Sequence, residues 1–116
     1  MNREQMDKLA AYGPGVYHSI SGSKTRRVVL CYLKKAGAST PYKISRESKL
    51  DYGNISGAIF GNGRRFSFEL SLMFLGLIRV NKYAVNKKTI SLTPEGLEMA
   101  GLIEQVPEWN THLEVP

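Results

Sequence analysis

Residues 40–59 read TPYKISRESKLDYGNISGAI and contain two helix start signals separated by a short turn. Thr40 is a hydroxyl N-cap, and the proline after it takes the first helical position, where a missing N–H costs no hydrogen bond. This helix runs to about residue 48 or 49. Asp51 can cap a second helix that begins directly after it. The stretch therefore predicts two short helices joined by a tight turn, which is a helix-turn-helix organisation.

A longer predicted helix precedes this pair and can brace both of its members. Ser23 is the expected N-cap, and residues 24–36 place Val29 and Leu33 on one apolar face. Gly37 ends this helix.

The first twenty residues predict one more helix. Residues 3–12 form a short amphipathic pattern, which the YGPG stretch of residues 12–15 interrupts. Residues 19–23 are typical of a loop.

Downstream of the pair, the pattern is mixed. FSFELSL at residues 66–72 alternates as a strand does, whereas Phe68, Leu72 and Leu75 equally fit one helical face. We favour a helix from about residue 67 to residue 75, ending at Gly76.

The last third of the chain predicts a hairpin and a helix. Residues 77–83 and 88–93 are rich in β-branched residues, and residues 84–87 between them can turn. Thr93 and the proline after it repeat the cap-then-proline signal and begin a helix that extends through Ile103. Pro107 stops the helix, and we expect the remaining tail to be irregular.

Three glycines recur at every fourth position of the second short helix: Gly53, Gly57 and Gly61. Each lowers helix stability by roughly 1 kcal/mol relative to alanine. Ile55 and Ile59 lie on the opposite side, so Gly53 and Gly57 should leave the outward face bare.

Two explanations of the bare face are open. It admits close approach to a nucleic acid, with Asn54 and Ser56 in reach of base edges, or it packs tightly against another helix. We favour the first, because Arg64 and Arg65 follow and suit a polyanion.

The charge is unevenly distributed along the chain. Residues 21–92 hold fourteen Lys and Arg against three acidic residues, a net charge of +11. Residues 1–20 balance, and residues 93–116 contain five glutamates and no Lys or Arg. A basic centre of this size indicates a polyanionic partner.

Composition limits the protein class. A chain of 116 residues with 42% apolar residues predicts one soluble domain, with no span for a membrane and no signal peptide. The single cysteine, Cys31, allows no internal disulfide and fits a buried thiol in a cytoplasmic protein.

Motifs for catalysis or cofactor binding are missing from the sequence. GSKT at residues 22–25 lacks the spacing of a phosphate-binding P-loop, and no strand precedes it. His18 and His112 have no metal-ligand spacing to another histidine or cysteine. We expect no enzyme activity, no metal and no cofactor.

Four segments stand in an informative order along the chain: TRRVVLCYLKKAG (25–37), residues 40–59, LGLIRV (75–80) and ISLTPEGLEMAGLI (90–103). This order resembles the winged-helix transcription regulators of the MarR and ArsR types, especially the small ones of archaea. In that family the helix after the turn enters the DNA major groove, and the hairpin, or wing, touches the backbone or minor groove. One departure is the insert FGNGRRFSFE (residues 60–69), which delays the start of the wing.

The resemblance implies a mostly helical α+β fold: a winged helix-turn-helix at residues 23–103, an N-terminal helix and linker at 1–22, and a C-terminal tail at 104–116. It implies sequence-specific binding of double-stranded DNA as a homodimer that pairs through its terminal segments. The alternative is a winged helix that binds RNA or a protein complex. The expected DNA-contacting residues are Lys43, Arg46, Tyr52, Gly53, Asn54, Ser56, Gly57, Arg64, Arg65, Lys82, Asn86, Lys87 and Lys88.

Overall fold

The computed structural model describes residues 1–85 and 87–110. Within these ranges the fold is α+β and mostly helical, with one two-stranded antiparallel sheet. The helices are α1 (Arg3–Ala10), α2 (Pro14–Ser21), α3 (Lys24–Ala36), α4 (Pro41–Ser48), α5 (Tyr52–Phe60), α6 (Pro94–Glu104) and α7 (Pro107–Asn110). A single 3₁₀ turn, η1 (Phe68–Leu70), precedes the strands β1 (Ile78–Ala84) and β2 (Lys87–Leu92).

The predicted N-caps of four helices are confirmed. The side chains of Ser23, Thr40, Asp51 and Thr93 accept hydrogen bonds from the third backbone N–H of α3, α4, α5 and α6, at 3.1 to 3.2 Å. Each cap satisfies a donor that the helix itself cannot.

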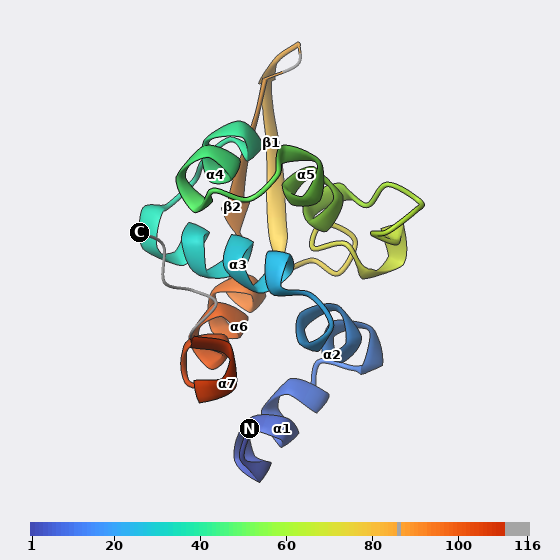
Figure 1. Ribbon diagram of the computed structural model, residues 1–116, viewed down its shortest axis with the longest axis vertical. Coiled ribbons are helices and arrows are strands. Elements are labelled where there is room, and N and C mark those ends of the chain that lie inside the picture. Colours follow the sequence, from blue (N-terminus) through green and yellow to red (C-terminus); the bar gives the residue numbers. More distant parts are fainter. Residues whose placement is uncertain (86, 111–116) are drawn as a thin grey trace.

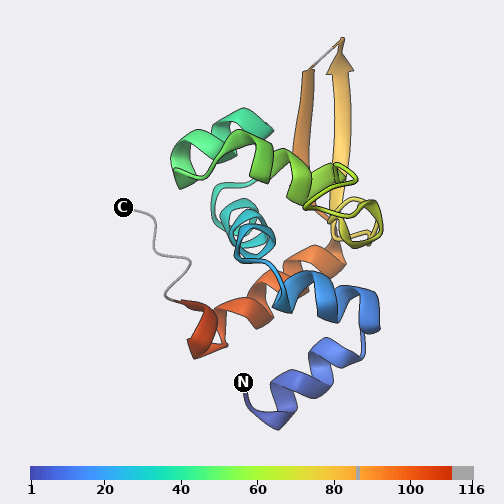
Figure 2. The same ribbon diagram turned by 45° about the vertical axis from the view of Figure 1, so that its right-hand side comes forward.

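Helix α3 lies at the centre of the molecule. It packs against α5 and α4 on one side and against α6 and α2 on the other (Figures 1 and 2). Its residues Val29 and Leu30 are fully buried, as are Ile44 of α4 and Ile55 of α5. One apolar core therefore fixes the α4–α5 pair to the rest of the chain.

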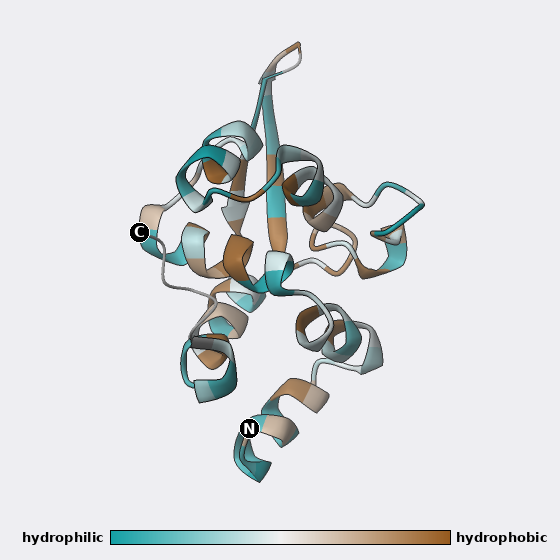
Figure 3. Cartoon of the chain, in the orientation of Figure 1, coloured by the Kyte–Doolittle hydropathy of each residue, from teal (hydrophilic) through white to brown (hydrophobic). Residues whose placement is uncertain are grey.

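The hairpin is confirmed, with its strands paired from Ile78 and Leu92 to Lys82 and Lys88. Its base is apolar, and its far half projects beyond the helices and is hydrophilic along the strands but hydrophobic at the tip (Figures 1 and 3). The segment between α3 and α4 joins it at one point, where Ser39 and Ile90 exchange backbone hydrogen bonds of 2.7 and 2.9 Å.

The prediction of a loop at residues 19–23 is wrong for its first part. Pro14 follows the break after α1 and takes the first position of a new helix, α2, which extends to Ser21. Val16 and Ile20 of α2 are buried, and the Ser19 hydroxyl donates to the Leu70 carbonyl at 2.7 Å. Tertiary packing thus orders a segment whose local signals indicate a break.

The predicted helix at residues 67–75 is also wrong. Only η1 forms there, and the backbone N–H groups of Leu72 and Met73 donate to the carbonyls of Ala58 and Ile59 in α5. The segment satisfies its backbone by folding onto α5.

Near the C-terminus, α6 ends at Glu104, before Pro107, as predicted. The prediction of an irregular tail from residue 108 onward is wrong for residues 108–110, which belong to the single turn α7, with Trp109 buried. Residues 111–116 of that predicted tail lie outside the described residues.

No helix in residues 1–85 and 87–110 combines the length and the apolar character that a membrane span requires.

Candidate nucleic-acid interface

Helices α4 and α5 and the hairpin meet around an open cavity of about 520 Å³, here called the interface cavity. Its lining brings together four residues of the predicted site: Tyr52 and Ser56 from α5, and Lys87 and Lys88 from β2. The other lining residues are Thr40, Pro41, Tyr42, Phe60 and Tyr83. Hydroxyl, ammonium and aromatic groups from three elements therefore face one space.

Three tyrosines of this cavity are exposed: Tyr42 by 64%, Tyr52 by 51% and Tyr83 by 63%. Tyr42 and Tyr83 were missed as site residues. Tyr83 stands next to Lys82 in the hairpin, and an aromatic residue among exposed lysines was the available signal.

A cation–π contact ties α5 to the hairpin. Lys88 Nζ lies 5.0 Å from the centroid of the Phe60 ring, at the last residue of α5. Lys82 is the cross-strand partner of Lys88 and is itself exposed. Like charges directly opposite each other on a sheet repel and lower stability. The contact with the Phe60 ring offsets part of this repulsion between Lys82 and Lys88.

Arg64 and Arg65 do not belong to α5, which ends at Phe60. They lie exposed in a tight loop, residues 62–66, here called the basic loop. The Asn62 carboxamide oxygen accepts from Arg64 N at 2.9 Å and from Phe66 N at 3.1 Å, and Asn62 N donates to Phe66 O at 2.8 Å. This loop projects from the α5 end on the side away from α4 (Figure 1).

The prediction that Gly57 lies on a bare outward face is wrong. Gly57 is buried, and a Cβ there would lie 2.5 Å from Phe66 Cδ2 and 2.9 Å from its Cγ. Gly53 is exposed, and its Cβ would meet only the Asp51 carboxylate, at 2.9 Å. The face expected to be bare is therefore open only in the first turn of α5.

Gly61, the last of the three glycines, is required both by its backbone conformation and by close packing. Its φ of +78° is in the left-handed region, and a Cβ would lie 2.7 Å from Phe68 Cα. Close packing explains Gly57 and Gly61, but the contacting segment is the insert rather than a second helix.

The remaining predicted residues surround this centre at several places. Asn54 is partly buried in the first turn of α5, and Lys43 and Arg46 are exposed on α4. Arg46 also lines a separate groove between α3 and α4. Asn86 lies outside the described residues.

Within the described residues, the cations of the predicted site form no ion pairs. Among residues 1–85 and 87–110, the cations in ion pairs are the Met1 amino group, Lys8 and Lys34, none of which belongs to the predicted site. The same ranges hold no group of three or more His, Cys, Asp or Glu arranged to bind a metal.

Two further arginines of α3 are buried. Burial lowers the pKa of Arg26 and Arg27, whose guanidinium groups donate to backbone carbonyls of residues 19–21. Arg26 lies over the Phe66 ring, 5.4 Å from its centroid. These two arginines support α2 and the insert and are not available at the surface.

A family model described as EarA-like matches residues 16–103. The chain belongs to the EarA-like family. The span shared with EarA-like proteins begins within α2 and ends within α6, so it contains the α4–α5 pair, the insert and the hairpin. Comparisons with curated proteins and with solved structures gave no match.

Proposed function

We propose that this EarA-like protein is a winged helix-turn-helix transcription regulator of the cytoplasm that binds double-stranded DNA. Helix α5 enters the major groove as the recognition helix, and the β1–β2 hairpin is the wing. The observation that carries the proposal is the interface cavity, where Tyr52 and Ser56 of α5 stand beside Lys87 and Lys88 of the hairpin.

The division of contacts follows from the chemistry of each element. Asn54 and Ser56, in the open first half of α5, reach base edges, because amide and hydroxyl groups can donate to and accept from bases. Lys43 of α4 and Lys82, Lys87 and Lys88 of the wing bind phosphates and set the register. Arg64 and Arg65 of the basic loop bind the backbone beyond the other end of α5.

The protein acts as a homodimer on operators with two-fold symmetry. Met6 of α1 and Leu97 of α6 support this part of the proposal, because both are large apolar side chains that are 45% and 50% exposed. Helix α1 lies at the opposite end of the molecule from the tip of the hairpin, and α6 follows the base of the hairpin (Figure 1).

One observation favours a second candidate function, which is binding of RNA. Tyr42, Tyr52 and Tyr83 are exposed around one cavity, and exposed aromatic rings stack on unpaired bases. The net charge of the face supports duplex DNA and single-stranded RNA equally.

Selection from fragmented genomic DNA, followed by anisotropy titrations with the selected duplex, a scrambled duplex and single-stranded RNA, tests the proposal. We expect one enriched sequence class and affinity for it about 10³-fold or more above the scrambled duplex, as specific regulators show. Tighter binding to RNA than to any duplex would replace the DNA proposal with the RNA one.

A further inference from the structure

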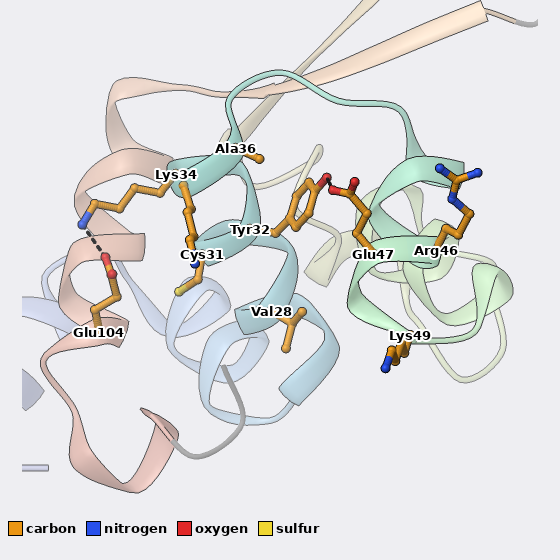
Figure 4. Close-up of a pocket in the computed structure, with 10 residues that line it drawn as sticks. Val28, Cys31, Tyr32, Lys34, Ala36, Arg46, Glu47, Lys49 and Glu104 are labelled. Atoms are coloured by element: carbon orange, nitrogen blue, oxygen red, sulfur yellow. Dashed lines mark hydrogen bonds and ion pairs between the residues drawn. The ribbon is translucent and has the colours of Figure 1, made fainter. Parts of the chain in front are cut away.

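Two hollows of the described structure differ in charge. The larger, a groove of about 1020 Å³ between α3 and α4, is lined by two carboxylates as well as by cations (Figure 4). Both carboxylates have a partner, because the Tyr32 hydroxyl donates to Glu47 and Lys34 pairs with Glu104. None of the described residues that line the interface cavity is Asp or Glu. Of the two, the interface cavity is therefore the one whose lining brings positive charge with no negative charge beside it.

The lining of the interface cavity also supplies hydrogen-bond donors. Ammonium groups come from Lys87 and Lys88, and hydroxyl groups come from Thr40, Ser56 and three tyrosines. Hydrogen bonds to an ionised acceptor are roughly twice as strong as those between neutral groups. The lining therefore suits an anion with several acceptor oxygens.

The three tyrosines reach the cavity from three different elements. Tyr42 is the second residue of α4, and Tyr52 is the first residue of α5. In β1 the register shifts between Lys82 and Ala84, which leaves Tyr83 without a cross-strand partner among the described residues. A bulge of this kind redirects a side chain, and Tyr83 lines the cavity together with the two helices.

All three tyrosine side chains are more than half exposed, so a ligand can reach both the rings and the hydroxyl groups. Each ring adds apolar surface to the polar handle of its hydroxyl. The cavity volume of about 520 Å³ lies in the range of sites for drug-sized molecules, which are larger than a phosphate group. The cavity therefore fits a phosphate together with the apolar face of an attached group.

A sugar–phosphate strand of DNA has this chemistry, and its position follows from the proposed function, on which this step rests. The major and minor grooves of B-DNA are separated by one strand. With α5 in the major groove, the hairpin reaches across that strand, and the cavity lies where α5 and the hairpin meet. Each phosphate of the strand carries one negative charge, and the carbon atoms of deoxyribose lie on either side of it.

We infer that the interface cavity binds one sugar–phosphate segment of the duplex. The hydroxyl groups of Tyr42, Tyr52 and Tyr83 donate to its phosphate oxygens, and the tyrosine rings pack against the deoxyribose. Lys87 and Lys88 neutralise the charge of the same segment. Tyr42 and Tyr83 are therefore DNA-contacting residues, although neither carries a charge.

Replacing each tyrosine with phenylalanine removes the hydroxyl and keeps the ring. The combined variant Tyr42→Phe, Tyr52→Phe and Tyr83→Phe should bind the duplex selected from genomic DNA about tenfold or more weakly, because hydrogen bonds to a charged group are lost. The slope of log affinity against log salt should stay the same, because tyrosine neutralises no phosphate. Tyr17→Phe, on α2 and outside the lining of the cavity, is the matched control and should bind as the unchanged protein does.

A scan of the selected duplex with single methylphosphonates, which are neutral, locates the contacted phosphate. At the phosphate that lies in the cavity, the neutral group should weaken binding of the unchanged protein. It should also remove most of the difference between the unchanged protein and the triple variant, because both changes remove the same interaction. Each single phenylalanine variant repeats this cycle with one hydroxyl removed, so the test does not depend on the folding of the triple variant.

The outcomes separate this inference from the proposed function. Full affinity of the triple variant for the selected duplex would overturn the inference and leave the proposed function standing. A weakening that is the same at every methylphosphonate position would also overturn it, because the hydroxyl groups would then contact no particular phosphate. Failure of the unchanged protein to bind any duplex would overturn both.

Discussion

The Phe66 ring occupies the space that a side chain at residue 57 would need. A Cβ at Gly57 would come within 2.5 Å of Phe66 Cδ2, and the same ring carries the Arg26 guanidinium, 5.4 Å from its centroid. The glycine, the ring and the buried arginine thus form one stack that joins α5, the insert and α3.

Gly57→Ala should therefore destabilise the protein by about 1–3 kcal/mol, because the added methyl overpacks a filled site. Gly53→Ala is the matched control on the same helix. It should cost less than Gly57→Ala, because the atom that it meets is the Asp51 Oδ2 that caps α5, at the end of an exposed side chain, rather than a buried ring. Urea unfolding of both variants measures the difference.

The stack can be tested as a unit by a double-mutant cycle. In a Phe66→Ala background the ring is gone, and Gly57→Ala should cost less than it does alone. Equal costs in both backgrounds would show that Phe66 is not the group that excludes a side chain at residue 57.

The combined change Lys87→Ala and Lys88→Ala should weaken binding to all duplex sequences about equally. It should also reduce the slope of log affinity against log salt by about 0.9 for each phosphate that the protein no longer neutralises. Lys8→Ala with Lys24→Ala, which removes two lysines of α1 and α3 that do not line the interface cavity, should leave that slope unchanged. An altered order of preferred sequences would mean that the hairpin reads bases.

Variants in the basic loop should affect DNA binding and stability separately. Arg64→Ala with Arg65→Ala should leave the thermal melt unchanged, because both side chains are exposed, and should weaken DNA binding. Asn62→Ala should lower stability by about 1 kcal/mol, because its carboxamide oxygen accepts from two backbone N–H groups of the loop. A double-arginine variant that binds duplex DNA normally would remove the loop from the proposed interface.

Alkaline pH should destabilise the protein partly through Cys31. Burial raises the pKa of the thiol from 9.0 to about 12, so the unfolded chain releases the proton first. The contribution of this thiol to stability is therefore fully present below about pH 9 and is lost as pH rises towards 12. Stability should fall as pH rises from about 9 to 12, and Cys31→Ser should reduce the fall by at most about 1.4 kcal/mol per pH unit. Denaturant titrations on both sides of pH 9 measure this slope. The raised pKa of Tyr12, also about 12, acts in the same direction in both proteins.

Local signals predicted the α4–α5 pair and the hairpin because the residues that start and end them act within a few positions. Thr40 and Asp51 cap their own helices, and Gly37 ends α3. These interactions do not depend on the rest of the fold, and a single sequence is enough to locate them.

The insert and the residues between it and β1 could not be predicted in the same way, because distant groups satisfy them. The backbone of Leu72 and Met73, just after the insert, bonds to α5, and Phe66 of the insert packs between Gly57 and Arg26. Spacing alone placed Gly57 opposite the apolar side chains of α5, yet it could not show that a later segment returns to cover that face. Half of the face of α5 that was expected to be open is covered for this reason.

The match between Gly57 and Phe66 has a consequence for the evolution of this family. The two positions cannot vary independently, because any side chain at residue 57 conflicts with an aromatic ring at residue 66. EarA-like proteins with a shorter connection between α5 and β1 should lack the ring and should carry alanine or a larger residue in place of the glycine. An alignment of such sequences should therefore show that insert length and the residue at position 57 change together.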